Sequence, residues 1–162
     1  MERICRVCHG KHLTRFLDLG FTPLADGFIS SNQLYEPEIY YPLDVYICND
    51  CSLIQLGYVV PPEILFQQDY PYVSSTTVAG TKHFHALAKE ICSRFSPNKD
   101  DLVIDIGSNV GVLLQGFQLQ GIKNVLGIEP AGNICRMANN NGIESIDEYI
   151  SEELATRNVK SK

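Results

Sequence analysis

The spacing of apolar and polar residues changes near the middle of the chain. In the first 60 residues, apolar side chains occur in short runs separated by turn-forming residues. Residues 43–47 and 53–58 are two such runs on either side of a Cys-x-x-Cys motif, and they predict an antiparallel hairpin. Residues 20–32 are rich in turn formers and predict an ordered loop around this hairpin. Pro61, Pro62 and Glu63 suit the first turn of a short helix.

The second part of the chain alternates between two periodicities. Residues 78–95 carry apolar side chains at helical spacing, and Thr76 or Thr77 can cap the start of this helix. Residues 102–106 and 124–128 are nearly continuous apolar runs, which are typical of parallel strands buried on both faces. Helices are expected over residues 110–119 and 133–140, and a third strand is expected over residues 143–146. This β-α-β-α-β order predicts a parallel sheet with right-handed crossovers.

These elements predict an α+β domain over residues 1–75, a connecting helix over 76–100, and the first half of an α/β, Rossmann-like fold over 101–162. The 44% hydrophobic and 20% charged content is that of a globular protein. A net charge of −6 without a basic stripe argues against nucleic-acid binding. We expect no membrane contact, because no apolar run approaches the ~20 residues of a membrane span. The N-terminus lacks the apolar stretch of a signal peptide, so a reducing cytoplasm is the expected location.

Two Cys-x-x-Cys pairs lie in the N-terminal part, and they predict a metal site. Each pair places two thiolates on one tight turn, and two such turns complete a tetrahedral zinc shell of four sulfurs. The predicted ligands are Cys5, Cys8, Cys48 and Cys51. A reducing compartment favours metal over two disulfides. His9 and His12 could each replace a cysteine, although four cysteines suffice. A core this small needs such a metal to hold its shape.

A glycine-containing turn follows the first predicted parallel strand, where open α/β sheets bind ligands. Asp105, at the tip of that strand, can accept hydrogen bonds from an ammonium or amide group. Glu129 ends the next strand about 20 residues after Gly107, where an acid can hold both ribose hydroxyls of an adenosine. Asn109 stands where a dinucleotide fingerprint has its middle glycine. The pattern therefore favours S-adenosylmethionine over an NAD-type cofactor or an empty turn. The candidate cofactor contacts are Asp105, Gly107, Ser108, Asn109, Gly111 and Glu129.

Several motifs together resemble one enzyme family. They are the two Cys-x-x-Cys pairs and residues 23–25, 42–45, 48–56, 65–66, 70–75, 105–109 and 127–130. With these motifs the chain is similar to the sugar C-methyltransferases of deoxysugar biosynthesis, in which a zinc-binding domain precedes an S-adenosylmethionine-dependent methyltransferase domain. The resemblance implies a nucleotide-linked keto-deoxysugar as substrate, and methylation of the carbon beside its ketone after a base removes the proton there.

The same resemblance extends the candidate site. It adds Pro130 to the cofactor contacts and implies that residues 70–75 line the cleft that faces cofactor and sugar. The candidate substrate contacts are Tyr70, Tyr72, Ser74 and Ser75. Alternatively, this stretch is a rigid proline turn whose tyrosines only pack.

Two departures limit what the resemblance implies. Val110 stands where the family usually carries an acid. About 60 residues from Leu102 onward hold only two βα units and a third strand, at ~30 residues per βαβ unit. No residue matches the family's catalytic positions, so no catalytic base is assigned and the chain is expected to be inactive alone. The alternatives are a binding module completed by a partner chain and a fragment of an NAD-type oxidoreductase.

The predicted sheet also has an unpaired edge, because the first strand would be central in the usual order of a doubly wound sheet. An apolar strand edge is a site of association. We expect it to pair with another copy, to be covered by the N-terminal domain, or to leave this half poorly ordered.

Overall fold

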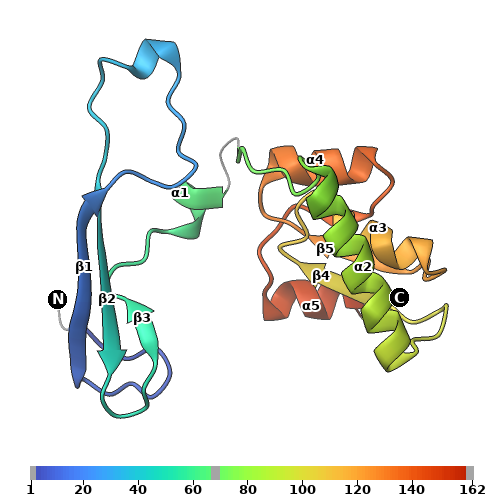
Figure 1. Cartoon of the computed structure of the whole chain (residues 1–162), viewed down its shortest axis with the longest axis horizontal. Helices are drawn as coiled ribbons and strands as arrows, with labels where there is room; N and C mark the ends of the chain where they lie inside the picture. Colours follow the sequence, from blue (N-terminus) through green and yellow to red (C-terminus); the bar gives the residue numbers. More distant parts are fainter. Residues whose placement is uncertain (1–2, 67–69, 160–162) are drawn as a thin grey trace. The chain divides into compact units, whose positions relative to one another are not determined.

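The computed structural model describes residues 3–66 and 70–159, and it divides into two units (Figure 1). The first unit is Met1–Leu65 and the second is Phe66–Lys162. The division falls before the predicted boundary at residue 75, and the predicted connecting helix lies within the second unit. Each unit is described by itself below.

An antiparallel sheet in the order β1-β2-β3 forms the first unit. Its strands are β1 (Leu13–Thr22), β2 (Tyr41–Cys48) and β3 (Ile54–Leu56). Val45 lies opposite Leu56 and Ile47 opposite Ile54, which confirms the predicted hairpin. A 3-10 turn, η1 (Ser31–Gln33), lies between β1 and β2, and the predicted short helix is α1 (Pro62–Phe66).

Strand β1 was not predicted, and its last residues fall in the segment expected to be a loop. Its pairing with β2 slips twice, between Arg15 and Leu17 and between Asp18 and Phe21. Apolar and polar residues alternate from Leu17 to Thr22, which is a strand pattern that the sequence reasoning did not use. The strand buries neither face, since residues 14–21 are exposed, and its pairing with β2 holds it in place.

The first unit buries few side chains. Its buried residues among those described are Cys5, Asp44, Tyr46, Cys48 and Gln55. Large apolar side chains between β1 and β2, such as Phe28 and Tyr35, are 81% and 97% exposed. Apolar burial alone therefore gives this unit little stability, since stabilisation grows with the apolar area removed from water.

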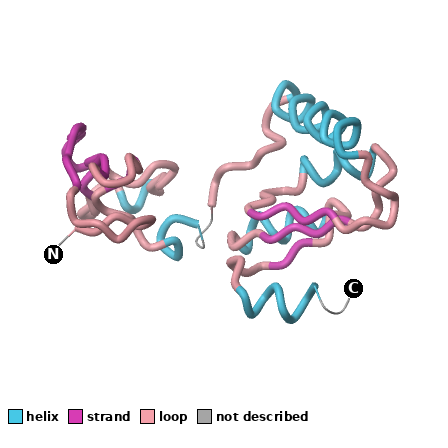
Figure 2. The backbone as a smooth tube through the Cα atoms, turned by 90° about the horizontal axis from the view of Figure 1, so that it is seen from below, coloured by secondary structure: helices cyan, strands magenta, loops and turns pink. Residues whose placement is uncertain are grey.

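The second unit contains the predicted parallel sheet, in the order β4-β5-β6. Its elements are α2 (Val78–Phe95), β4 (Val103–Ile106), α3 (Val112–Leu119), β5 (Val125–Ile128), α4 (Gly132–Asn140), β6 (Ser145–Ile146) and α5 (Glu152–Val159). Thr77 caps α2, because its hydroxyl accepts a hydrogen bond from the Gly80 N–H at 3.0 Å. The β-α-β-α-β order is as predicted, whereas α5 was not predicted. Figure 2 shows α5 and the long helix α2 on opposite sides of the three strands.

The glycine turn between β4 and α3 packs closely against the chain that leads into β6. Gly111 has a φ of +78°, and a Cβ at this position would lie 2.6 Å from the Ile143 side chain. Ile143 itself is 1% exposed and belongs to the main apolar cluster, with Leu114 of α3 and Val125 of β5. Gly111 therefore serves the packing of the turn.

Strand β4 is an edge strand, and one expectation for it is wrong. All four residues of β5 are buried, as predicted, but Ile104 and Ile106 of β4 are 37% and 60% exposed. Within the described residues β4 pairs only with β5, so its other edge has no strand partner. Association through this edge stays a prediction. No helix in residues 3–66 or 70–159 is long and apolar enough to cross a membrane.

Candidate functional site

The four predicted zinc ligands lie together in the first unit. The Sγ atoms of Cys5 and Cys51 are 3.6 Å apart, as are those of Cys8 and Cys48, and all four sulfurs lie within 4.8 Å of one another. A disulfide requires about 2.05 Å between sulfurs. A tetrahedral zinc ion with bonds of about 2.3 Å places its sulfur ligands about 3.8 Å apart. The cluster therefore has the dimensions of a zinc shell.

The two cysteine turns have the same local construction. The His9 N–H donates to the carbonyl of Cys5 at 3.0 Å, and the Ser52 N–H donates to that of Cys48 at 2.8 Å. His9 and Ser52, which directly follow the two motifs, have φ values of 58° and 64°. In each motif, the backbone therefore reverses direction at a left-handed residue directly after the second cysteine. Neither histidine weighed as a ligand joins the cluster, since His9 forms this turn and His12 contacts Asp50 at 3.0 Å.

The electrostatics of the cluster favour a cation at its centre. Backbone N–H groups, first that of Cys8 and then that of Val7, lower the pKa of the Cys5 thiol to about 6. The Gly10 N–H lowers the pKa of Cys8, but the neighbouring thiols of Cys51 and Cys5, burial and Cys48 together raise it to about 12. Four thiolates at these separations repel one another, and a divalent cation offsets that repulsion.

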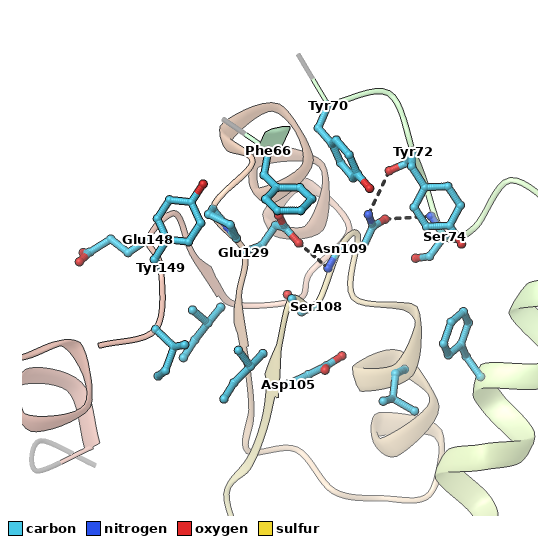
Figure 3. A pocket seen from close by; sticks show the side chains of 17 residues that line it. Phe66, Tyr70, Tyr72, Ser74, Asp105, Ser108, Asn109, Glu129, Glu148 and Tyr149 are labelled. Atoms are coloured by element: carbon cyan, nitrogen blue, oxygen red, sulfur yellow. Dashed lines mark hydrogen bonds between the residues drawn. The ribbon is translucent and has the colours of Figure 1, made fainter. Parts of the chain in front are cut away.

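A cavity of about 480 Å³ lies in the second unit, at the carboxyl ends of the parallel strands (Figure 3). This volume is within the range of about 300–1,000 Å³ for small-molecule sites. Asp105 from β4, Glu129 after β5 and Tyr149 after β6 all line it. In Figure 3, Glu148 and Tyr149 lie on one side, Tyr72 and Ser74 on the other, and Glu129 between them.

Most of the candidate contacts from the sequence meet in this cavity. The lining includes Asp105, Gly107, Ser108, Asn109, Glu129, Pro130, Tyr70, Tyr72 and Ser74. Gly111 and Ser75 are not among the lining residues. The lining also contains residues that sequence reasoning missed, notably Leu113, Glu148, Tyr149 and Ile150. The only signal for residues 148–150 was their position after the third strand.

The Glu129 carboxylate links three segments that lie at the base of the cavity, which we call the cavity floor. It is 6% exposed, and its Oε2 accepts the Asn109 N–H at 2.8 Å while its Oε1 accepts the Ala131 N–H at 2.9 Å. These bonds join the end of β5 to the glycine turn and to the start of α4. Because each carboxylate oxygen has two lone pairs, both oxygens keep an acceptor site for a ligand.

Two neighbouring residues, Gly107 and Asp105, have features that a ligand could use. Gly107 has a φ of +75°, and the position of its missing Cβ has no atom within 4 Å. Burial, and then the charge of Glu129, raise the pKa of the Asp105 carboxyl. These two residues fit a ligand that presents a cation close to the backbone of the turn. The Ser108 hydroxyl is buried without a hydrogen-bond partner in the structure, which is uncommon, but it lies against Gly127 of β5 and is closed to the cavity.

Comparison with known proteins supports the metal site and relates the whole chain to a methyltransferase. Residues 5–66 match a family described as a zinc binding domain. The chain is 34% identical over 157 residues to the C-methyltransferase NovU of Streptomyces niveus, in an alignment that covers 94% of this chain and 37% of that protein. The predicted resemblance to C-methyltransferases with an N-terminal zinc-binding domain is confirmed, and the chain spans about a third of the length of this relative.

Replacing one exposed ligand tests the zinc site. In Cys51→Ser we expect loss of the single bound zinc ion and faster proteolysis within residues 1–65, because structural zinc supplies about 10–16 kcal/mol of folding free energy in small zinc domains. Metal content by mass spectrometry and limited proteolysis measure both effects. The matched control is Cys92→Ser, which lies outside the cluster and should keep the zinc. Full zinc content in Cys51→Ser would contradict the assignment.

The raised pKa of Asp105 predicts how stability changes with pH. A carboxyl whose folded pKa lies above its ordinary 3.8 binds its proton more tightly in the folded state. Its stabilising contribution is present below pH 3.8 and is lost as the pH rises through the raised pKa. Without ligand, Asp105→Asn should therefore unfold at a higher temperature than the wild type at pH 7, and the difference should shrink toward pH 4. The exposed control Asp100→Asn should show no such trend, and a lower melting temperature of Asp105→Asn at pH 7 would contradict this prediction.

Proposed function

We propose that the second unit binds S-adenosylmethionine and forms the beginning of a Rossmann-like methyltransferase domain. The observation that carries this proposal is the row of side chains at the tips of adjacent parallel strands. Asp105, Glu129 and Tyr149 follow the order β4-β5-β6 across one cavity. In open α/β sheets, ligands bind at the carboxyl ends of the strands. The similarity to a C-methyltransferase supports the same cofactor.

In this proposal, each strand tip would hold a different part of the cofactor. Asp105 would hold the ammonium group of the amino-acid end. This cation would compensate the burial and the charge of Glu129, which together raise the pKa of the Asp105 carboxyl. Glu129 would accept hydrogen bonds from the ribose hydroxyls through its remaining lone pairs. The adenine base would lie toward Tyr149 and Ile150, where an aromatic and an aliphatic side chain line the cavity.

The reaction would be C-methylation of a nucleotide-linked keto-deoxysugar. When bound, S-adenosylmethionine supplies an electrophilic methyl group. Tyr70, Tyr72 and Ser74 line the same cavity and would offer hydroxyl groups to the sugar. No described residue is assigned as the base, and we propose that the chain is inactive alone, with zinc in a structural role. Four free cysteines close together suit a reducing cytoplasm.

The two alternatives predict different ligands. A binding module would take neither S-adenosylmethionine nor NAD, and an oxidoreductase fragment would take NAD. The Asn109 side chain occupies the place of the middle glycine of a dinucleotide fingerprint, where a pyrophosphate requires a close approach to bare backbone. The relative of this chain is a methyltransferase. These observations favour S-adenosylmethionine.

Calorimetric titration of the full chain with S-adenosylmethionine, S-adenosylhomocysteine and NAD tests the proposal. We expect binding of the two adenosyl compounds and none of NAD. Glu129→Ala should weaken S-adenosylhomocysteine binding by about 1–3 kcal/mol, because buried hydroxyl groups lose their acceptor. Binding of NAD alone, or of no compound, would overturn the cofactor assignment.

A second titration separates ribose recognition from the support that Glu129 gives to the turn. The wild type should bind the 2′-deoxy analogue of S-adenosylhomocysteine more weakly than the parent compound, and Glu129→Ala should lose this discrimination. The control Glu90→Ala, an exposed acid on α2, should keep it. Equal discrimination in Glu129→Ala and the wild type would remove Glu129 from the ribose site.

A further inference from the structure

Residues 70–74, which we call the strap, are fastened to the cavity wall by two asparagine side chains. The Asn109 Nδ2 donates to the Tyr72 carbonyl at 3.0 Å, and its Oδ1 accepts the Ser74 N–H at 2.8 Å. The Asn133 Nδ2 donates to the Tyr70 carbonyl at 2.9 Å. The three bonds therefore engage alternate residues of the strap, and Figure 3 shows the two that Asn109 makes.

Apolar packing holds the strap to the same part of the unit. Val73 and Tyr70 pack against a buried cluster that contains Val110 beside the glycine turn and Ile134 of α4. Asn109 lies in that turn and Asn133 in the first turn of α4. These contacts attach the strap to the glycine turn and to the start of α4, in addition to the Tyr70–Phe66 ring contact and the bond from the Thr76 N–H to the Val73 carbonyl.

Asn109 contacts both the strap and the predicted cofactor site. Its side chain binds the strap, while its backbone N–H donates to the Glu129 Oε2 at 2.8 Å. Its φ of 50° is left-handed, a conformation that glycine, asparagine and aspartate adopt more readily than other residues. Among those three residues, asparagine alone offers both the acceptor that the Ser74 N–H uses and the donor that the Tyr72 carbonyl uses.

We propose that Asn109 is a positioning residue that couples occupancy of the cavity to the placement of the strap. A ligand held at Glu129 fixes the glycine turn through the Asn109 N–H, and the turn fixes residues 70–74 through the Asn109 amide. Tyr70, Tyr72 and Ser74 line the cavity, so the side chains that face a substrate would be ordered when the cofactor site is filled. Coupling of this kind is reciprocal, and an ordered strap strengthens ligand binding. This inference rests on the proposed function.

Amide hydrogen exchange of the zinc-loaded full chain, measured by NMR with and without S-adenosylhomocysteine, tests the coupling. Asn109→Gly tolerates the left-handed backbone and keeps the N–H to Glu129 but removes the amide. We expect the Ser74 amide to exchange about 5- to 10-fold faster in the ligand-free variant, as for one lost hydrogen bond. Asn109→Asp keeps an acceptor for this N–H and should restore its protection.

In the wild type the ligand should slow amide exchange across the strap. In Asn109→Gly this effect should disappear, and the affinity for S-adenosylhomocysteine should fall about 5- to 10-fold.

Asn139→Ala is the matched control. The Asn139 side chain also makes three bonds to backbone, with the Cys135 carbonyl and with both the carbonyl and the N–H of Ser145, and none of them reaches the strap. This variant should leave exchange in the strap and its response to ligand unchanged. Binding of S-adenosylhomocysteine with equal strap protection in the wild type and Asn109→Gly would overturn the coupling alone. Absence of binding to the wild type would instead overturn the proposed function, and unchanged Ser74 exchange in ligand-free Asn109→Gly would overturn the attachment itself.

Discussion

The first unit depends on four sulfur atoms because it has almost no apolar interior. Cys5 and Cys48 are fully buried, whereas many of its larger apolar side chains are exposed to solvent. Small domains bury a smaller fraction of their surface than large ones and need a further source of stability. The cluster joins the chain before β1 to the turn that follows β2, so an ion bound there would fix the ends of a sheet that burial fixes only weakly.

In the second unit, polar side chains link segments at the carboxyl ends of the strands, beside a small apolar cluster that contains Val110 and Ile134. The main apolar cluster, to which α2, α3 and β5 contribute, packs the helices against the sheet. At the carboxyl ends of the strands, the Glu129 carboxylate and the Asn109 amide connect a strand, a glycine turn and the strap through backbone hydrogen bonds. In both units, side chains with directional bonding geometry join separate segments at a candidate site.

Local sequence patterns predicted the elements that depend on their own residues. The Cys-x-x-Cys turns, the helix capped by Thr77, the buried strand β5 and the glycine turn all carry a local signature, and all were found. Strand β1 was missed although residues 17–22 alternate apolar and polar side chains, because Gly20 and the turn formers after it favoured a loop from that residue onward. The exposure of Ile106 was missed because an apolar run does not show how many neighbours a strand will have. The lining residues Glu148 and Tyr149 belong to no motif, and only the arrangement of the strands brings them to the cavity.

The sequence pattern predicted that the residues of the glycine turn, with Asp105 and Glu129, all contact the cofactor, whereas in the structure they have different roles. Asn109 and Glu129 have hydrogen bonds within the protein that shape the cavity, and Gly111 makes room for Ile143. Asp105 and Ser108, by contrast, have a poorly compensated charge and a buried hydroxyl without a partner. A buried carboxyl with a raised pKa has a cost that a bound cation would offset. Asp105 lies in β4, Ser108 and Asn109 lie in the glycine turn, and Glu129 follows β5, so the groups come from separate segments that meet at one end of the sheet. This is the arrangement expected of a site whose shape is set by the protein and whose remaining bonds are completed by a ligand.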